Sequence, residues 1–180
     1  MVLSRAECIE RYGSDYLIQQ KINAGELYRI SKGIFSEQAY VPELAIMTYK
    51  YPKAVVTMNS AFYHYGLTDA IPDRTDLATD RDAPKITDPR VHQYFQPKEL
   101  FSAGVQNAGE QGYSFRIYSK ERMLIELLRY KNKLSFDFYK EVLLNYRKIM
   151  GQLDIQKIQD YAMISPKSKM ILNALQMEVF

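Results

Sequence analysis

The sequence predicts an α+β protein in which a small N-terminal module of two helices and a hairpin precedes a mixed region with a helical C-terminus. Cap residues followed by apolar side chains at helical spacing predict helices at both ends of the chain, and short β-prone runs between turn residues predict strands in the middle. A chain of 180 residues, 47% hydrophobic and 25% charged, is long enough to bury a core. We expect two domains, residues 1–38 and 39–180.

The first helix is expected to begin after Ser4, because Ser4 and Glu7 have the spacing of a capping box. Cys8 is expected on its buried face. Gly13 ends the helix, since glycine readily adopts the backbone conformation of a helix C-terminus. Ser14 then caps a second helix, which ends near Gly25.

A hairpin is expected next, with strands over 27–30 and 34–36 and a glycine-containing turn over 31–33. Two helices joined by a short glycine turn and followed by a hairpin have the order of a winged helix-turn-helix. The sequence therefore predicts a winged helix-turn-helix as the N-terminal module.

The second region is expected to alternate between helices and strands before it becomes helical. A helix is predicted over 42–51, a short strand over 53–57, and a further helix capped by Asn59 or Ser60. The remaining predictions are strands at 75–80, 91–96 and 113–118, a charged loop at 81–90, a turn at 107–112, and helices that begin after Ser119, Ser135, Asp154 and Ser165. This order is typical of an α+β region.

Three segments, in order along the chain, resemble one family. GELYRISKGIF at residues 25–35 is similar to the wing hairpin of AbiEi-type antitoxins. YPKAVVTMNSAFYHYGLTD at residues 51–69 and IYSKERMLIE at residues 117–126 are similar to that family's second and third motifs, although Glu126 stands where the family often has aspartate. The chain thus resembles the AbiEi family of antitoxins, winged-helix regulators of viral defence.

The resemblance implies a role in a type IV toxin–antitoxin, or abortive-infection, system. It implies that the winged helix binds inverted repeats in double-stranded DNA of its own promoter and acts as a transcriptional repressor. It also implies that the second domain counters a nucleotidyltransferase toxin without a stable complex. Glu121 and Arg122, at the start of a helix, are interpreted as structural, and Arg122 is expected to pair with a carboxylate of the neighbouring strand region. By the resemblance, both are also candidate residues of the antitoxin surface.

Polar side chains on the second helix and the hairpin are the candidates for DNA contact. They are Ser14, Asp15, Tyr16, Gln19, Gln20, Lys21, Asn23, Arg29 and Lys32. Glutamine and asparagine can pair with adenine edges, lysine can reach guanine or phosphate, and a helix N-terminus suits a phosphate oxygen. The alternative interpretation is an ordinary polar helix face beside an ordinary hairpin.

The charge of the chain is weak evidence for a nucleic-acid partner. The net charge is +3. Residues 1–36 carry five basic side chains (Arg5, Arg11, Lys21, Arg29, Lys32) and four acidic ones (Glu7, Glu10, Asp15, Glu26). Such a near-neutral module is expected to bind DNA with modest affinity and strong salt dependence.

Enzymatic functions find little support in the sequence, and we expect no catalytic residue, cofactor or metal. Acidic residues gather at Asp69, Asp73, Asp76, Asp80 and Asp82, but no (D/E)-x-K tripeptide of a restriction-type nuclease occurs, so a solvated loop is the preferred interpretation. His64 and His92 are interpreted as structural. Lacking a long apolar run, the chain is expected to be cytoplasmic. The alternatives are a protein-interaction module without DNA binding and a metal-dependent nuclease.

Overall fold

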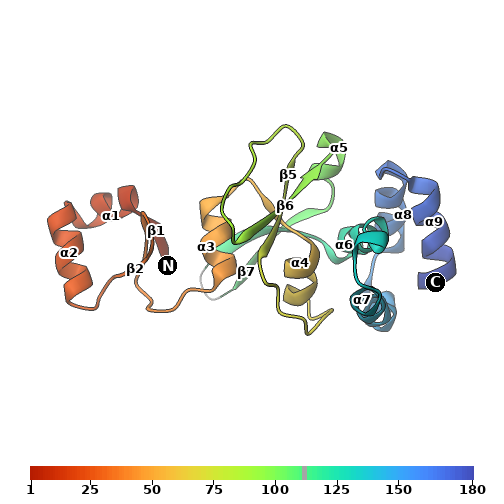
Figure 1. The fold of residues 1–180 in the computed structure, drawn as a ribbon, viewed down its shortest axis with the longest axis horizontal. Coiled ribbons are helices and arrows are strands. Elements are labelled where there is room, and N and C mark those ends of the chain that lie inside the picture. Colours follow the sequence, from red (N-terminus) through yellow and green to blue (C-terminus); the bar gives the residue numbers. More distant parts are fainter. Residues whose placement is uncertain (111–112) are drawn as a thin grey trace. The chain divides into compact units, whose positions relative to one another are not determined.

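A computed structural model describes residues 1–110 and 113–180 and shows an α+β protein with two β-sheets and a helical C-terminus (Figure 1). The chain forms two compact units. The first comprises Met1–Pro52 and Ala108–Phe115, and the second comprises Lys53–Asn107 and Arg116–Phe180. The predicted boundary between residues 38 and 39 falls inside the first unit, because helix α3 (Glu43–Lys50) contacts strand β1 (Val2–Ser4).

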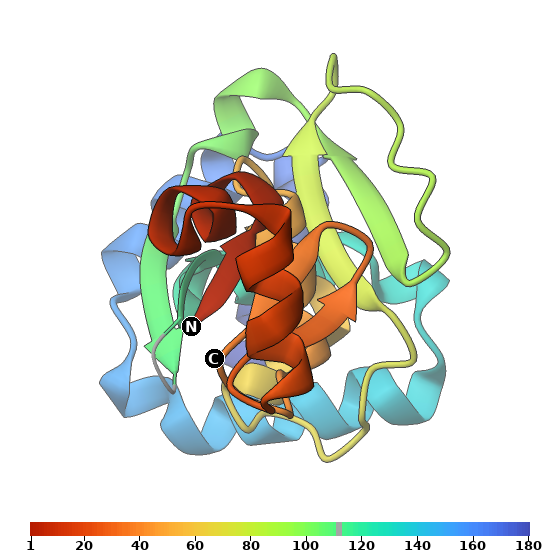
Figure 2. The same cartoon turned by 90° about the vertical axis from the view of Figure 1, so that its left-hand side faces the viewer.

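The first unit places two short helices beside a three-stranded sheet (Figure 2). After β1 come α1 (Arg5–Tyr12), α2 (Asp15–Asn23), β2 (Tyr28–Ser31) and β3 (Ile34–Ser36). The strand order is β1-β3-β2, and both pairings are antiparallel. The helices and the hairpin lie where the sequence predicts them, whereas β1 was not predicted.

Local signals explain the helices of this unit. Ser4 and Glu7 form the predicted capping box, since the Ser4 hydroxyl accepts from the Glu7 N–H and the Glu7 carboxylate accepts from the Ser4 N–H. Gly13 ends α1 with φ 94°, a conformation that favours glycine, and its N–H donates to the Ile9 carbonyl at 2.7 Å. Ser14 caps α2 by accepting from the Leu17 N–H at 3.3 Å.

A small core holds the two helices against the sheet. Its buried members are Leu3, Cys8, Ile18, Leu27 and Phe35. Cys8 is a fully buried core residue, as the sequence predicts. Leu17, the neighbour of Ile18 on α2, lies outside this core and is 42% exposed.

The second unit contains most of a mixed five-stranded sheet with the order β6-β5-β4-β8-β7; the residues of β7 and β8 that fall within Ala108–Phe115 are assigned to the first unit. The strands of this sheet are β4 (Val55–Val56), β5 (Thr75–Asp80), β6 (Val91–Gln96), β7 (Val105–Glu110) and β8 (Tyr113–Tyr118). Strand β4 is antiparallel to β5 and parallel to β8, and β5 is parallel to β6. The interior strand β5, between β6 and β4, is buried over Thr75–Thr79, as expected for a strand covered on both faces.

Helices cover this sheet and form the C-terminal part of the chain. They are α4 (Met58–His64), α5 (Lys98–Phe101), α6 (Lys120–Arg129), α7 (Phe136–Ile149), α8 (Ile155–Ile164) and α9 (Ser168–Ala174), with short turns at Lys131–Lys133, Met150–Gln152 and Leu175–Val179. Helix α6 packs against α4, α7, α8 and α9, and its residues 122–128 are all buried. Among the described residues, no helix combines the length and the apolar character that crossing a membrane requires.

The first turn of α4 is capped by a residue from another element. The sequence predicts Asn59 or Ser60 as the cap, but the cap residue is Thr57, whose side chain makes no capping hydrogen bond. Asp76 of β5 takes this role, because its carboxylate accepts from the Ser60 N–H at 3.1 Å. In return, the Ser60 hydroxyl accepts from the Asp76 N–H at 2.8 Å.

Two other predictions about the second region are wrong or incomplete. Residues 105–110 form β7, although the sequence predicts a turn from residue 107; residues 111 and 112 of that turn lie outside the described residues. The last helix begins at Ser168 and not directly after Ser165.

Candidate nucleic-acid interface

Helix α2 presents a polar face. Ile18 is buried in the core of the first unit, while Asp15, Tyr16 and the two glutamines Gln19 and Gln20 are exposed. Asn23, at the C-terminal end of the helix, is also exposed. The predicted contact residues of this helix therefore face away from the core, apart from Ser14 and Lys21, which are half-buried.

Hydrogen bonds along α2 order its exposed amides. The Gln20 Nε2 donates to the Tyr16 hydroxyl at 2.8 Å, and the Gln19 Nε2 donates to the Asn23 Oδ1 at 3.0 Å. Both pairs are four residues apart, the spacing at which side chains meet on a helix. A ligand that reads these amides has to replace hydrogen bonds that the free protein already makes.

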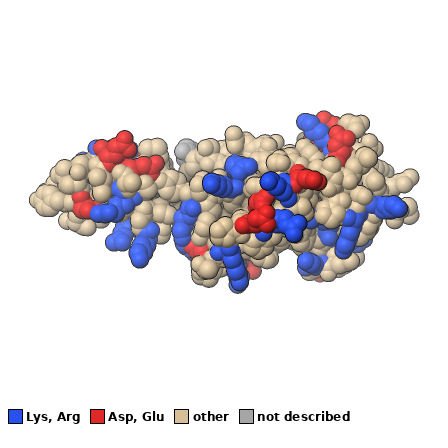
Figure 3. Space-filling model, turned by 90° about the horizontal axis from the view of Figure 1, so that it is seen from above, with Lys and Arg blue, Asp and Glu red and all other residues tan. Residues whose placement is uncertain are grey.

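Ion pairs reduce the effective charge of this surface. Arg5 of α1 binds Asp15 through Nε at 2.9 Å and through a second, shorter contact, and Lys21 binds Glu26 at 2.5 Å. The hydrogen bond to Glu26 raises the pKa of Lys21. Figure 3 shows acidic and basic side chains interspersed over this unit, with no large field of one sign on the face shown.

The hairpin adds two exposed cations to the same unit. Arg29 lies on β2 opposite Phe35, and Lys32 lies in the turn beside Gly33, which has φ 76°. Neither Arg29 nor Lys32 forms a salt bridge with a described residue, so both positive charges remain available to an anionic partner. The arrangement offers hydrogen-bonding amides on a helix and separate cations on a β-turn.

The candidate antitoxin surface at the start of α6 includes Glu121 but not Arg122, because Arg122 is buried. Glu121 is half-exposed and its carboxylate accepts from the Asp154 N–H at 3.3 Å. Arg122, in contrast, is 0% exposed and pairs with Glu126 one turn along the same helix. Arg122 is therefore structural, as predicted, but it does not lie on a surface, and its predicted pair with a carboxylate of the strand region is wrong.

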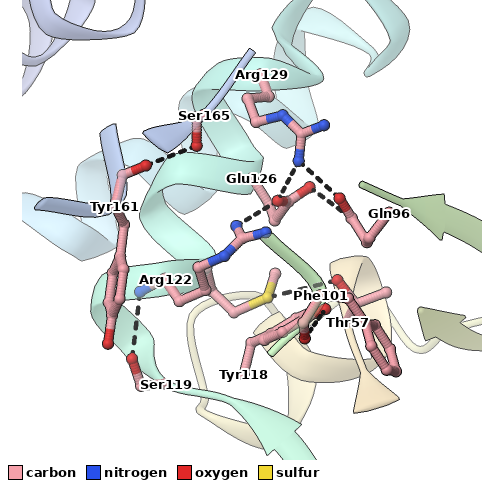
Figure 4. A network of polar contacts seen from close by, with 11 residues as sticks. Thr57, Gln96, Phe101, Tyr118, Ser119, Arg122, Glu126, Arg129, Tyr161 and Ser165 are labelled. Atoms are coloured by element: carbon pink, nitrogen blue, oxygen red, sulfur yellow. Dashed lines mark hydrogen bonds and ion pairs between the residues drawn. The ribbon is translucent and has the colours of Figure 1, made fainter. Parts of the chain in front are cut away.

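Arg122 belongs to a buried polar network (Figure 4). The Glu126 carboxylate is 0% exposed and binds Arg122 on one side and the Arg129 Nη1, at 2.5 Å, on the other. Gln96 of β6 closes the network, because its Nε2 donates to Glu126 at 3.2 Å and its Oε1 accepts from Arg129 at 2.9 Å. Sequence reasoning missed Gln96 and Arg129; the i, i+4 spacing of Arg122 and Glu126 was the available signal.

The Arg122 guanidinium is only partly satisfied. Its Nη1 group forms the ion pair with Glu126, but none of its three nitrogens, Nε, Nη1 and Nη2, makes a hydrogen bond of normal geometry with a described residue. Its charged end lies over the ring of Tyr118, with 4.7 Å between Cζ and the ring centroid, an arrangement in which the ring face attracts the cation. These interactions make Arg122 a structural residue of the helix bundle.

The acidic residues at 69–82 do not form a single solvated loop. Asp76 is 5% exposed and lies in the interior strand β5, while Asp69, Asp73 and Asp82 are exposed. In the described part of the chain, no group of three or more histidine, cysteine, aspartate or glutamate side chains is placed to hold a metal ion. The prediction of a solvated loop is therefore wrong for Asp76.

Asp76 should make the stability of the protein depend on pH. Burial raises the pKa of its carboxyl group to about 6, although hydrogen bonds from the backbone of Ser60 and Asn59 and the neighbouring His92 favour the charged form. The folded state then binds this proton more tightly than the unfolded state, whose pKa is about 4. The free energy of unfolding should therefore fall as the pH rises from about 4 to about 6, by on the order of 2 kcal/mol for this group.

Chemical denaturation across this pH range can test the prediction when Asp76→Asn is compared with the parent protein. Both proteins should carry His92→Gln, because the His92 imidazole contacts the Asp76 carboxylate and would contribute to the comparison. We expect the difference between the two stability curves to slope downward for the aspartate-containing protein between pH 4 and 6. A flat or rising difference would contradict the assignment.

The fold defines an α+β protein that joins a small helical and three-stranded unit to a larger mixed unit. Among solved structures, the crystal structure of the RV2827C protein from Mycobacterium tuberculosis is similar, with a TM-score of 0.68 over 98% of this chain and 71% of that chain. The two sequences are 13% identical, so the likeness concerns the fold alone. No protein-family model matches the sequence. No curated protein matches it either.

Proposed function

We propose that the first unit is a winged helix that binds double-stranded DNA, with α2 in the major groove and the β2–β3 hairpin against the backbone. The observation that carries the proposal is the exposed amide face of α2 in the same unit as an exposed basic turn. The strand order β1-β3-β2, with α1 and α2 inserted between β1 and β2, is consistent with this class of module.

The chemistry of the helix face suits recognition of base edges. Gln19, Gln20 and Asn23 carry amides that can form paired hydrogen bonds with adenine, and Lys21 can donate to guanine or phosphate. Ser14 and the N–H groups of the first turn suit a phosphate oxygen. Asp15 is compatible with a nearby phosphate because Arg5 neutralises it, and Tyr16, 70% exposed, can donate to the backbone.

Arg29 and Lys32 are proposed to hold the duplex by charge. Each interaction between a cation and a phosphate releases counterions, so binding should weaken steeply as salt is added. The ion pairs of Arg5 and Lys21 leave few uncompensated cations, which favours a moderate affinity.

We propose further, from the resemblance to AbiEi-type antitoxins, that the protein represses its own promoter and opposes a nucleotidyltransferase toxin. Glu121 remains a candidate of the antitoxin surface. Arg122 is proposed to contribute through the packing of α6, because it is buried. A downstream reading frame for a nucleotidyltransferase would favour this proposal.

Gel-shift titration with the upstream DNA of the gene, at two salt concentrations, tests DNA binding. Gln19→Ala combined with Gln20→Ala should reduce the preference for this DNA over unrelated DNA, by about 1–3 kcal/mol for each base that is no longer recognised. Lys32→Ala should weaken binding to both DNAs equally and make the salt slope shallower by about 1.

Lys157→Ala is the matched control, because Lys157 is exposed and lies in the second unit. This variant should leave both the preference for the upstream DNA and the salt dependence of binding unchanged. If neither set of variants alters binding, the assigned DNA-binding residues are wrong. Absence of binding at low salt would favour a protein-interaction module, and magnesium-dependent cleavage of plasmid DNA would favour a nuclease.

A further inference from the structure

A cavity of about 310 Å³ lies in the second unit, where the start of α4, strands β5 and β6, and the beginning of α7 meet. Its volume is at the lower end of the range for small-molecule sites. Asn59, Asp76, His92, Tyr94 and Phe138 are among the residues that line it. Its lining therefore combines hydrogen-bond acceptors with aromatic rings.

The acceptors of the cavity are buried and incompletely used. The Asn59 Oδ1 is buried and has no hydrogen-bond partner among the described residues. Asp76 is 5% exposed, and the N–H groups of Asn59 and Ser60 and the hydroxyl of Tyr94 already donate to its carboxylate. A buried acceptor without a donor destabilises the folded state, so an unpaired Asn59 oxygen calls for an explanation.

An imidazole of this chain already lies against the carboxylate. The His92 Nδ1 is 3.4 Å from the Asp76 Oδ1, and the His92 side chain is 57% exposed, so an incoming cation can displace it. The rings of His92 and Tyr94 lie 4.4 Å apart, centroid to centroid. Such ring faces attract cations.

The backbone at the cavity is strained. Met58, which also lines the cavity, has φ 43°, in the left-handed region that side chains other than glycine rarely adopt. Strain of this kind destabilises the folded state and is concentrated at functional sites. The strained backbone of Met58 and the unpaired oxygen of Asn59 therefore both destabilise the protein at this cavity.

We propose that this cavity binds a guanidinium group of the kind that an arginine side chain carries. A guanidinium is planar, cationic and donor-only, so it satisfies both the Asn59 oxygen and the Asp76 carboxylate while it stacks on Tyr94 or Phe138. The charged residues that line the cavity also favour a cation, since the two acidic residues Asp73 and Asp76 face one basic residue, Arg74. An ammonium group has the same charge, but it lacks the flat face that stacks on an aromatic ring and the row of N–H donors along the edge of a guanidinium.

Titration of the full chain with Nα-acetyl-arginine methylamide, followed by NMR at neutral pH, tests the proposal. The citrulline counterpart is the matched control ligand, because it has nearly the same shape without the charge. We expect saturable shifts at Asn59, Asp76 and Tyr94, with a Kd on the order of 1 mM. The citrulline ligand should bind at least tenfold more weakly.

Two variants separate ligand binding from a structural role. Asp76→Asn and Asn59→Leu should each weaken binding at least tenfold, whereas Asp160→Asn, on the exposed side of α8, should not. Asn59→Leu should also raise the Tm, because it removes the unpaired buried acceptor. Equal binding of the citrulline ligand, absence of saturable shifts, or full binding by Asn59→Leu would overturn the proposal.

Discussion

Glu126→Ala should lower the free energy of unfolding by about 3–5 kcal/mol, a large fraction of the stability of a domain of this size. The Glu126 carboxylate lies between Arg122, which is fully buried, and Arg129, whose side chain is 13% exposed. Removing the carboxylate leaves the Arg122 charge buried without a counter-charge, and Gln96 loses an acceptor. Urea denaturation of the variant and the parent protein measures the effect.

A double replacement provides the control. Arg122→Met combined with Glu126→Leu removes the buried ion pair and fills a similar volume with apolar atoms, while Arg129 can turn toward solvent. Such exchanges are often neutral or stabilising, so the double variant should be more stable than Glu126→Ala by roughly 2 kcal/mol or more. A loss below about 1 kcal/mol in Glu126→Ala would show that the network contributes little.

Gly104→Ala should also destabilise the protein strongly, by about 2–4 kcal/mol. Gly104 has φ 72°, and a Cβ atom added there would lie 2.6 Å from the Arg122 Cβ and 2.9 Å from its Cγ. Its carbonyl accepts from the Ser119 N–H at 2.7 Å, so the segment cannot move away without breaking this hydrogen bond at the start of α6. Thermal and urea unfolding should both report the destabilisation.

Gly66→Ala separates backbone strain from overcrowding. Gly66 has φ 66° in the same unit, but a Cβ there would meet nothing within 4 Å. It should cost about 1 kcal/mol, the strain alone. If Gly66→Ala and Gly104→Ala destabilise the protein equally, close packing against Arg122 has no energetic role.

The parts of the fold that were predicted correctly are those with a local signal. The helices that follow Ser4, Ser14, Ser119, Ser135 and Asp154 begin where a side-chain oxygen caps the first turn. Strands at 75–80, 91–96 and 113–118 were also predicted with the observed bounds. Strand β7 was missed because VQNAGE lacks alternating apolar residues, so its pairing depends on the neighbouring strand and not on its own sequence.

The candidate sites, like the fold, were predicted correctly only where a local pattern in the sequence indicates them. The exposed face of α2 follows from helical spacing, and its residues lie where that spacing puts them. The burial of Arg122 and Asp76 depends on which elements cover them, and a charged residue is on average exposed. The cavity beside Asn59 joins residues from four elements, and no spacing in the sequence indicates it.

The cap of α4 by Asp76 has a consequence for the order of folding. Because the group that satisfies the first turn of this helix comes from 16 residues away, α4 cannot gain its N-terminal hydrogen bond until β5 has docked on β4. A peptide of residues 57–65 should therefore have little helix in water. During refolding, α4 should acquire protection from hydrogen exchange together with the sheet, and later than helices that carry their own serine caps.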